Sequence, residues 1–331
     1  MKISRCAACF LLMVSARAHP GEAGTEETFT DEQHRGLSRF VMRQAVRLNE
    51  WLADAVLDED ERETDVMRHF YGDRDSAYHA MGSYIEISPR LDWSSREDFR
   101  ADVRFSARLR LRGLSDRFRF FLDSQDRDQE LVDELFTERF RSTSRSEQRQ
   151  DATAGLMYQI SDRVSRRISV SGGLRFRPMP TPRLRTDARF FSDLGAWHAE
   201  FGQRFFWDMD TGFGERSQLQ FTRPVRDVHT FRLTSSAIWS EESQGVDLAQ
   251  TVMWWTELSE HRMLSFRAGI LGYTRPQLES DLYFGRVTYR RRAGRDWLFV
   301  EVETGADFER EHDFDITPVA GIKLICLFGS Y

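Results

Sequence analysis

The chain has 331 residues, 30% of them charged, with a formal net charge of −6 and a mean hydropathy of −0.55. No stretch approaches the roughly 20 consecutive apolar residues of a membrane-spanning α-helix, which excludes a helical membrane protein. Aromatic and aliphatic residues are too plentiful for a disordered chain, and a pI of about 5.8 argues against a partner made of nucleic acid.

Residues 1–18 have the features of a secretory signal peptide. A positively charged start precedes a short apolar run at 6–14, and small residues around Ala18 suit the cleavage site. The apolar run is too short to stay in a bilayer as a helix. Cleavage near Ala18 removes two of the three cysteines and leaves Cys326, so we expect no intramolecular disulfide in the mature chain.

Residues 19–82 are expected to form a leader, an amphipathic helix and an acidic linker on the periplasmic side. Within 30–58, apolar residues recur at spacings of three and four, which places them on one helical face. Arginines at steps of four from Arg35 to Arg47 occupy a second face, typical of a solvated helix or of one that meets anionic lipid headgroups. Residues 59–82 are acidic and irregular, and we interpret them as the linker.

From residue 83 to residue 331 the hydrophobic period changes to two. The clearest stretch is 99–112, where seven apolar side chains alternate with seven mostly arginine side chains. A strand of that length is roughly 45 Å long, much longer than the usual strand of a soluble sandwich. The same alternation recurs at 84–93, 167–176 and 197–202.

Such alternation is expected of a strand that has lipid on one face and a polar lumen on the other. Hydrocarbon accepts only apolar side chains on the outside of a membrane barrel, while a wet or salt-bridged lumen accepts charge on the inside. The pattern therefore predicts an all-β protein, a transmembrane antiparallel up-and-down β-barrel over 83–331, preceded by the amphipathic helix.

Two kinds of break alternate along this region, which predicts 14 strands, or 12 if two weak segments within 213–240 are miscounted. The tight turns are expected at 114–116, 161–163, 192–194, 225–227, 258–260 and 293–295. The other, on average longer, polar breaks are expected to face outward from the cell at 94–98, 123–150, 178–182, 208–212, 241–246, 276–280 and 308–315.

The chain stops on the aromatic Tyr331, with Ile325 and Leu327 at two-residue spacing behind it. This ending resembles the C-terminal signal of outer-membrane barrels, and 83–331 as a whole resembles the porin-like barrels of Gram-negative bacteria, with no specific family identified. The resemblance implies an outer-membrane location, contact with outer-membrane lipid and lipopolysaccharide, and delivery to the barrel assembly machinery.

Strand parity places a set of charged side chains in the lumen. They are Arg100, Asp102, Arg104, Arg108, Arg110, Arg175, Arg189, Glu200, Arg204, Arg232, Arg267, Arg286, Glu301 and Glu303. An excess of arginine would raise the local concentration of anions in a pore. Alternatively, the charges pair across strands and fill the lumen with a salt-bridge lattice. The long segment 123–150 is a candidate constriction.

Tryptophans near the proposed turns and loops suit the aromatic belts at the two membrane–water interfaces. The candidates are Trp93, Trp197, Trp207, Trp239, Trp254 and Trp297.

The sequence favours a passive pore for small solutes, anions in particular, that is not an enzyme. One alternative is a non-conducting, anchoring barrel that docks a periplasmic protein through residues 30–58. A second is an outer-membrane lipid hydrolase or protease, for which the neighbouring His312 and Asp313 are the only candidate pair. We assign no catalytic residue, no metal site and no cofactor.

Overall fold

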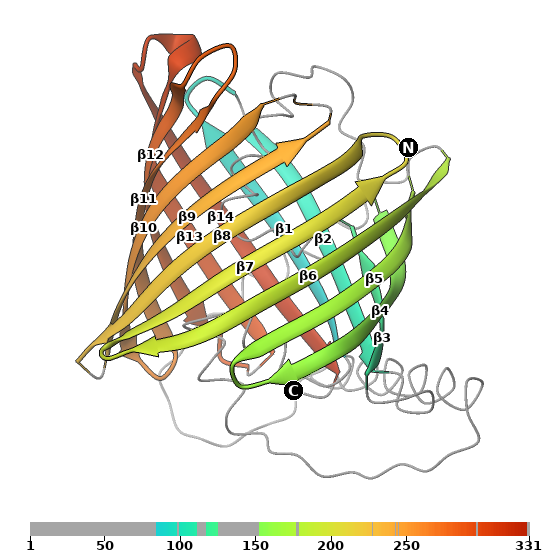
Figure 1. The fold of residues 1–331 in the computed structure, drawn as a ribbon. Helices are drawn as coiled ribbons and strands as arrows, with labels where there is room; N and C mark the ends of the chain where they lie inside the picture. The colour runs from blue at the N-terminus through green and yellow to red at the C-terminus, as the bar shows by residue number, and fades with distance from the viewer. Residues whose placement is uncertain are drawn as a thin grey trace, which may run out of the picture. The chain divides into compact units, whose positions relative to one another are not determined.

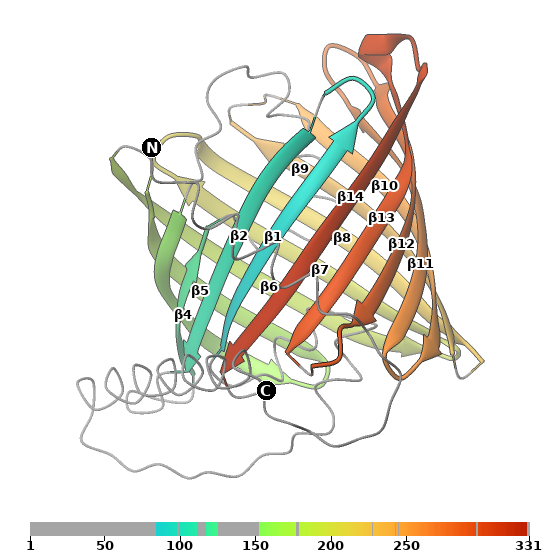
Figure 2. The ribbon, with the colours of Figure 1, turned by 180° about the vertical axis from the view of Figure 1, so that it is seen from behind.

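The computed structural model describes residues 84–329 apart from positions 98, 111–116, 125–151, 177–178, 227, 242, 244 and 296. In it, each strand pairs antiparallel with its neighbours in sequence, and β1 closes the ring against β14 (Figures 1 and 2). This confirms the predicted 14-stranded up-and-down barrel and excludes 12 strands. The signal peptide, the helix at 30–58, the linker and nearly all of 123–150 lie outside the described residues.

The strands vary in length from the 6 residues of β3 to the 15 of β6. In chain order they are β1 Tyr84–Ser94, β2 Phe99–Arg110, β3 Phe118–Asp123, β4 Ala152–Arg163, β5 Arg166–Phe176, β6 Pro180–Leu194, β7 Trp197–Asp208, β8 Gly212–Val225, β9 His229–Ser240, β10 Val246–Ser259, β11 Arg262–Tyr273, β12 Glu279–Arg292, β13 Leu298–Glu309 and β14 Ile316–Gly329.

The connections alternate between two rims of the barrel. What we call the loop rim carries 95–98, 124–151, 177–179, 209–211, 241–245, 274–278 and 310–315. The turn rim carries 111–117, 164–165, 195–196, 226–228, 260–261 and 293–297. A 3₁₀ helix at Arg310–His312 lies on the loop rim, and among the described residues no helix is long and apolar enough to cross a membrane.

Three tight turns lie two or three residues later than the sequence predicted. Residues 161–163, 192–194 and 258–259 belong to strands β4, β6 and β10. Bulges between Gln159 and Ser161 and between Glu257 and Ser259 carry two of these strands past their turn-like residues. Asp193 likewise still pairs with His198 across the β6–β7 hairpin. Polar residues mark the water-exposed strand ends here, not the turns themselves.

Along β2, apolar side chains point outward and polar side chains point inward, as the sequence alternation predicts. Val103 points outward and is 50% exposed, whereas Arg108 points inward and is 8% exposed. Each strand of the barrel thus separates an apolar outer surface from a polar inner one.

The inner surface is not polar throughout, because it also carries apolar side chains that the sequence pattern did not single out. Near the loop rim, Ala249, Leu271, Leu282 and Phe284 form a buried cluster on β10–β12. Near the turn rim the buried inward side chains are Tyr84, Trp255, Met263, Phe299, Ile325 and Leu327. Ile325 and Leu327, read from the sequence as part of the C-terminal signal, therefore face the lumen. The continuous apolar run Leu324–Phe328 therefore combines inward apolar side chains at 325 and 327 with apolar side chains of the outer surface at 324, 326 and 328.

Gly269 is the residue that lets Phe284 lie flat against the inner wall. The two are direct partners between β11 and β12. A Cβ atom on Gly269 would lie 2.6 Å from the Phe284 ring and 2.9 Å from the carbonyl oxygen of Gln250. These contacts are too short for any side chain, so the close packing of the ring requires glycine.

We therefore expect Gly269→Ala to destabilise the barrel by about 1–3 kcal/mol, because the Phe284 ring and the backbone must move apart. The measurement is the free energy of unfolding in urea, in lipid vesicles, followed by tryptophan fluorescence. Gly285→Ala is the matched control on the neighbouring strand, since a Cβ there meets nothing within 4 Å. Equal stability of the two variants would contradict the packing argument.

Candidate functional site: the charged lumen

The strand register turns all of the charged residues singled out from the sequence toward the lumen. Arg100, Asp102, Arg104 and Arg108 alternate with outward residues along β2, and Arg110 shares their register although its side chain is not described. The remaining nine follow the same parity on β5, β6, β7, β9, β11, β12 and β13. The structure sorts these residues into distinct clusters.

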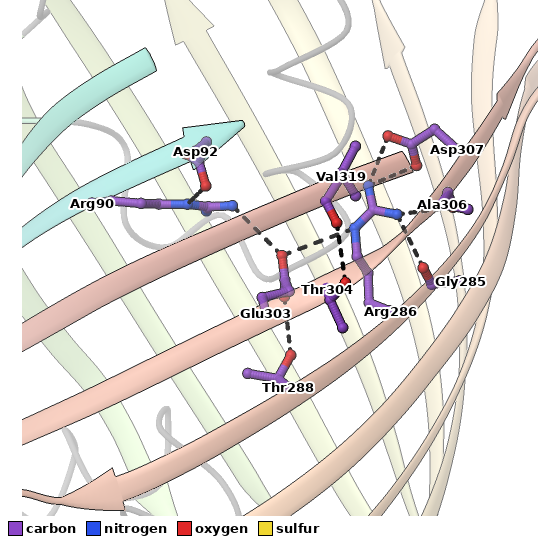
Figure 3. Close-up of polar contacts among 10 residues, drawn as sticks. All are labelled: Arg90, Asp92, Gly285, Arg286, Thr288, Glu303, Thr304, Ala306, Asp307 and Val319. Carbon is purple, nitrogen blue, oxygen red and sulfur yellow. Dashed lines mark hydrogen bonds and ion pairs between the residues drawn. The ribbon is translucent and has the colours of Figure 1, made fainter. Parts of the chain in front are cut away.

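One cluster is built around Arg286 of β12 (Figure 3). Its Nη2 atom donates to both carboxylate oxygens of Asp307, at 2.6 and 2.8 Å. Its Nη1 atom donates to the backbone carbonyls of Gly285 and Ala306, and the guanidinium lies over the Phe284 ring. The Arg286 and Asp307 side chains are only 9% and 16% exposed. A charge held by this many acceptors is fixed in place.

Glu303 links this cluster to β1. It accepts a hydrogen bond from Thr288 at 3.0 Å and lies 3.6 Å from Nη2 of Arg90, which itself donates to Asp92 at 2.7 Å (Figure 3). The intervening residue of β14 is Gly321, and a Cβ there would lie 2.5 Å from Asp92 Oδ1. The glycine leaves the space through which these side chains meet across β14.

A second ion-pair cluster lies on β6 and β7. Asp187 stands between two arginines, with one carboxylate oxygen 2.5 Å from Nε of Arg204 and the other 3.1 Å from Nε of Arg185. Arg189 and Glu200 form a looser pair at 3.6 Å. A recess with a volume of about 30 Å³ lies beside these groups, enough for water molecules only.

Arginines exceed carboxylates along the arc β2–β6, which we call the arginine arc. Its inward arginines are Arg100, Arg104, Arg108, Arg119, Arg167, Arg175, Arg183, Arg185 and Arg189. The inward carboxylates on the same strands are Asp102, Asp123, Asp162, Asp187 and Asp193. On β12–β14 and β1, by contrast, basic and acidic side chains balance, as in the buried pair of Arg290 with Glu301.

Arg232 on β9 and Arg267 on β11 belong neither to the arginine arc nor to the two ion-pair clusters. Arg232 donates to Thr222 Oγ1 at 3.1 Å and lies 4.9 Å from the centroid of the inward-facing Trp255 ring. Arg267 faces Met253 on one neighbouring strand and Arg286 on the other.

Sequence reasoning missed several inward charges at strand ends. Asp208 forms an ion pair with Arg175 at 2.8 Å, and Asp307 holds Arg286, yet both were assigned to loops or their edges. Inward side chains recur at every second residue, so extending this alternation by four residues from Arg204 and from Glu303 would have predicted both. Arg216, which donates to Gln218 at 2.8 Å, was missed because nearly all of β8 lies within 213–240, where the alternation is weak.

The tryptophans lie at both rims. Trp93, Trp207 and Trp239 lie near the loop-rim ends of β1, β7 and β9. Trp197, Trp254 and Trp297 lie toward the turn rim, where they contact other aromatic rings. The Arg223 guanidinium also covers Trp197, at 5.6 Å from the ring centroid. Two separated groups of outer tryptophans define an apolar zone between them.

The histidine of the candidate catalytic pair contacts a different carboxylate. His312 lies in the 3₁₀ helix with its Nε2 atom 3.4 Å from Glu309, and Asp313 follows in the left-handed backbone conformation. His198, at the turn rim, pairs instead with Asp193 at 2.5 Å. Among the described residues no group of three or more His, Cys, Asp or Glu side chains could hold a metal ion.

Neither a family model nor a curated protein matches the sequence. The chain is similar to the solved structure of the KdgM porin, at 8% identity over 73% of this chain and 98% of that chain, with a TM-score of 0.35. It is also similar to the structure of OprB of Pseudomonas putida, at 10% identity over 78% of this chain and 97% of that chain, with a TM-score of 0.48. A bacterial polysaccharide outer membrane secretin is similar at 9% identity over 76% of this chain and 98% of that chain, with a TM-score of 0.46. The function proposed below therefore rests on the barrel's own side chains.

The Arg286–Asp307 contact is expected to stabilise the barrel much more than an exposed ion pair does. Arg286→Gln should lower the free energy of unfolding by about 3 kcal/mol, because it removes the guanidinium that binds both oxygens of the largely buried Asp307 carboxylate. The control is Arg167→Gln, whose contact with Asp162 has side chains 35% and 57% exposed. We expect that control to cost less than about 1 kcal/mol. Equal losses in urea unfolding would show that Arg286 holds no buried network.

Proposed function

We propose that this protein is a passive channel of a Gram-negative outer membrane, exported by a signal peptide cleaved near Ala18, that admits small solutes and favours anions. The membrane location is supported by the apolar outer surface between two groups of tryptophans. A closed barrel also satisfies every ladder hydrogen bond of its strands, which hydrocarbon requires. On this proposal the turn rim is periplasmic and the loop rim faces outward.

The observation that carries the solute preference is the arginine arc. Side chains of one charge sign gathered along one side of a low-dielectric wall focus the electric field and raise the local concentration of the opposite ion. Arginine keeps its charge at any physiological pH, so the preference should not depend on pH in that range.

The ion-pair clusters support the same proposal in a different way. Arg286 and Asp187 are each held by several partners, so the wall on β12–β14 and on β6–β7 is rigid. A rigid wall keeps a fixed charge pattern as solutes pass. Selectivity would then depend on the less buried arginines of the arc, such as Arg100 and Arg104.

The test is the current through refolded full-length protein in a planar bilayer under a KCl gradient. We expect stepwise conductance with a reversal potential on the anion side. Arg100→Gln combined with Arg104→Gln should lower the anion-to-cation permeability ratio by roughly two-fold, because two lumen charges are lost.

Arg223→Gln is the matched control, since Arg223 lies on the outer surface of β8 and should leave the ratio unchanged. Absence of any stepwise current would reject the channel and favour the anchoring barrel, with residues 30–58 as the docking segment. If the channel conducts but its anion-to-cation permeability ratio is unchanged in the double variant, the role of the arginine arc is rejected and the channel itself is not.

A further inference from the structure

A polar patch interrupts the outer surface on four consecutive strands. It consists of Gln203 on β7, Ser217 on β8, Ser235 on β9 and Gln250 on β10, and we call it the amide patch. By register, Gln203 and Gln250 are the only amide side chains that point outward from the described strands. Elsewhere the outer surface at comparable positions carries side chains such as Val103, Val302 and Ile322.

The amide patch lies within the apolar zone, away from both interfaces. Gln203 is four residues from Trp207 and six from Trp197 on the same strand, and its outward neighbours are the exposed Phe201 and Phe205. At a strand's rise and a tilt of about 40°, this places the amide roughly 10 Å below one group of tryptophans and roughly 15 Å above the other.

The four side chains form two equivalent hydrogen-bonded pairs. The Ser217 hydroxyl donates to Gln203 Oε1 at 2.7 Å, and the Ser235 hydroxyl donates to Gln250 Oε1 at 2.6 Å. In each pair the amide oxygen is satisfied, while the amide NH₂ group donates to no residue that the structure describes. Hydrocarbon offers no acceptor for these N–H groups, so leaving them in lipid is costly.

The order of the patch across the strands is symmetric: Gln, Ser, Ser, Gln. Ser217 directly faces Ala237, and Ser235 lies two residues nearer the turn rim on the same strand. Because the strands slant (Figure 1), a line of constant depth moves toward the turn rim from one strand to the next. The two-residue offset therefore keeps both pairs at a similar depth.

We propose that the amide patch is the contact surface of a homodimer, with a second copy of this chain as its occupant. Two copies with the same orientation in a membrane are related by a two-fold axis along the membrane normal. Such an axis places β7 of one copy against β10 of the other, so Gln203 of one copy faces Gln250 of the other at a similar depth. An amide both donates and accepts, so each NH₂ group finds an acceptor there.

This inference does not depend on the channel, since a non-conducting barrel would carry the same patch. The test uses full-length protein with Cys6, Cys9 and Cys326 replaced by serine, refolded into phosphatidylcholine vesicles. Gln203→Cys and Gln250→Cys are combined in one chain, which is then oxidised. We expect a disulfide-linked dimer. The matched control combines Val103→Cys with Ile322→Cys, two outward positions on β2 and β14, and should stay monomeric.

A second measurement removes the amides without disturbing the barrel. Gln203→Leu with Gln250→Leu keeps both positions compatible with lipid, so cooperative unfolding should remain intact. Single-molecule photobleaching in vesicles should show two-step bleaching for the wild type and one-step bleaching for the variant, with a dimer dissociation constant raised at least ten-fold. A monomeric wild type, a dimer that survives the leucine substitutions, or a ladder of higher cross-linked species would each overturn the proposal.

Discussion

Every backbone N–H and C=O group of a chain inside hydrocarbon must find its partner within the protein, and this requirement shapes the molecule. Fourteen antiparallel strands meet it only if the last pairs with the first, which β14 does with β1 from Ser94↔Val319 to Tyr84↔Gly329. Closure leaves no free edge and divides the side chains between an outer and an inner surface. The apolar exterior, the ion-pair clusters and the amide patch are consequences of that division.

The two surfaces treat polar groups in opposite ways. Inside, charge is retained by mutual contact, as when Asp187 bridges Arg185 and Arg204 or when Arg286 donates to both oxygens of Asp307. Outside, a polar side chain has no solvent to meet, so an amide there implies contact with protein. The same chemistry that indicates a channel on one face thus indicates a partner on the other.

The strand period of two could be recognised from the sequence, because a strand between lipid and lumen alternates at every residue. The inward direction of residues such as Arg104 and Glu301 followed from it, and the strand number followed from the alternating short and long breaks. The exact turns could not be predicted, because bulges such as that at Glu257/Ser259 change the register without a clear signal. The inward apolar cluster around Leu271 and the contact of Glu303 with Arg90 could not be predicted either, since both depend on neighbours far apart in sequence.

In a membrane barrel, lipid touches one face of each strand and the lumen touches the other. Nitroxide labels at each position from Arg100 to Phe105 on β2 test it directly in vesicles. The account predicts that collision with oxygen, which partitions into lipid, peaks at Ala101, Val103 and Phe105. Collision with a water-soluble nickel chelate should peak at Arg100, Asp102 and Arg104. Protection of the apolar face from both reagents would contradict the account, because it would mean that protein covers the barrel.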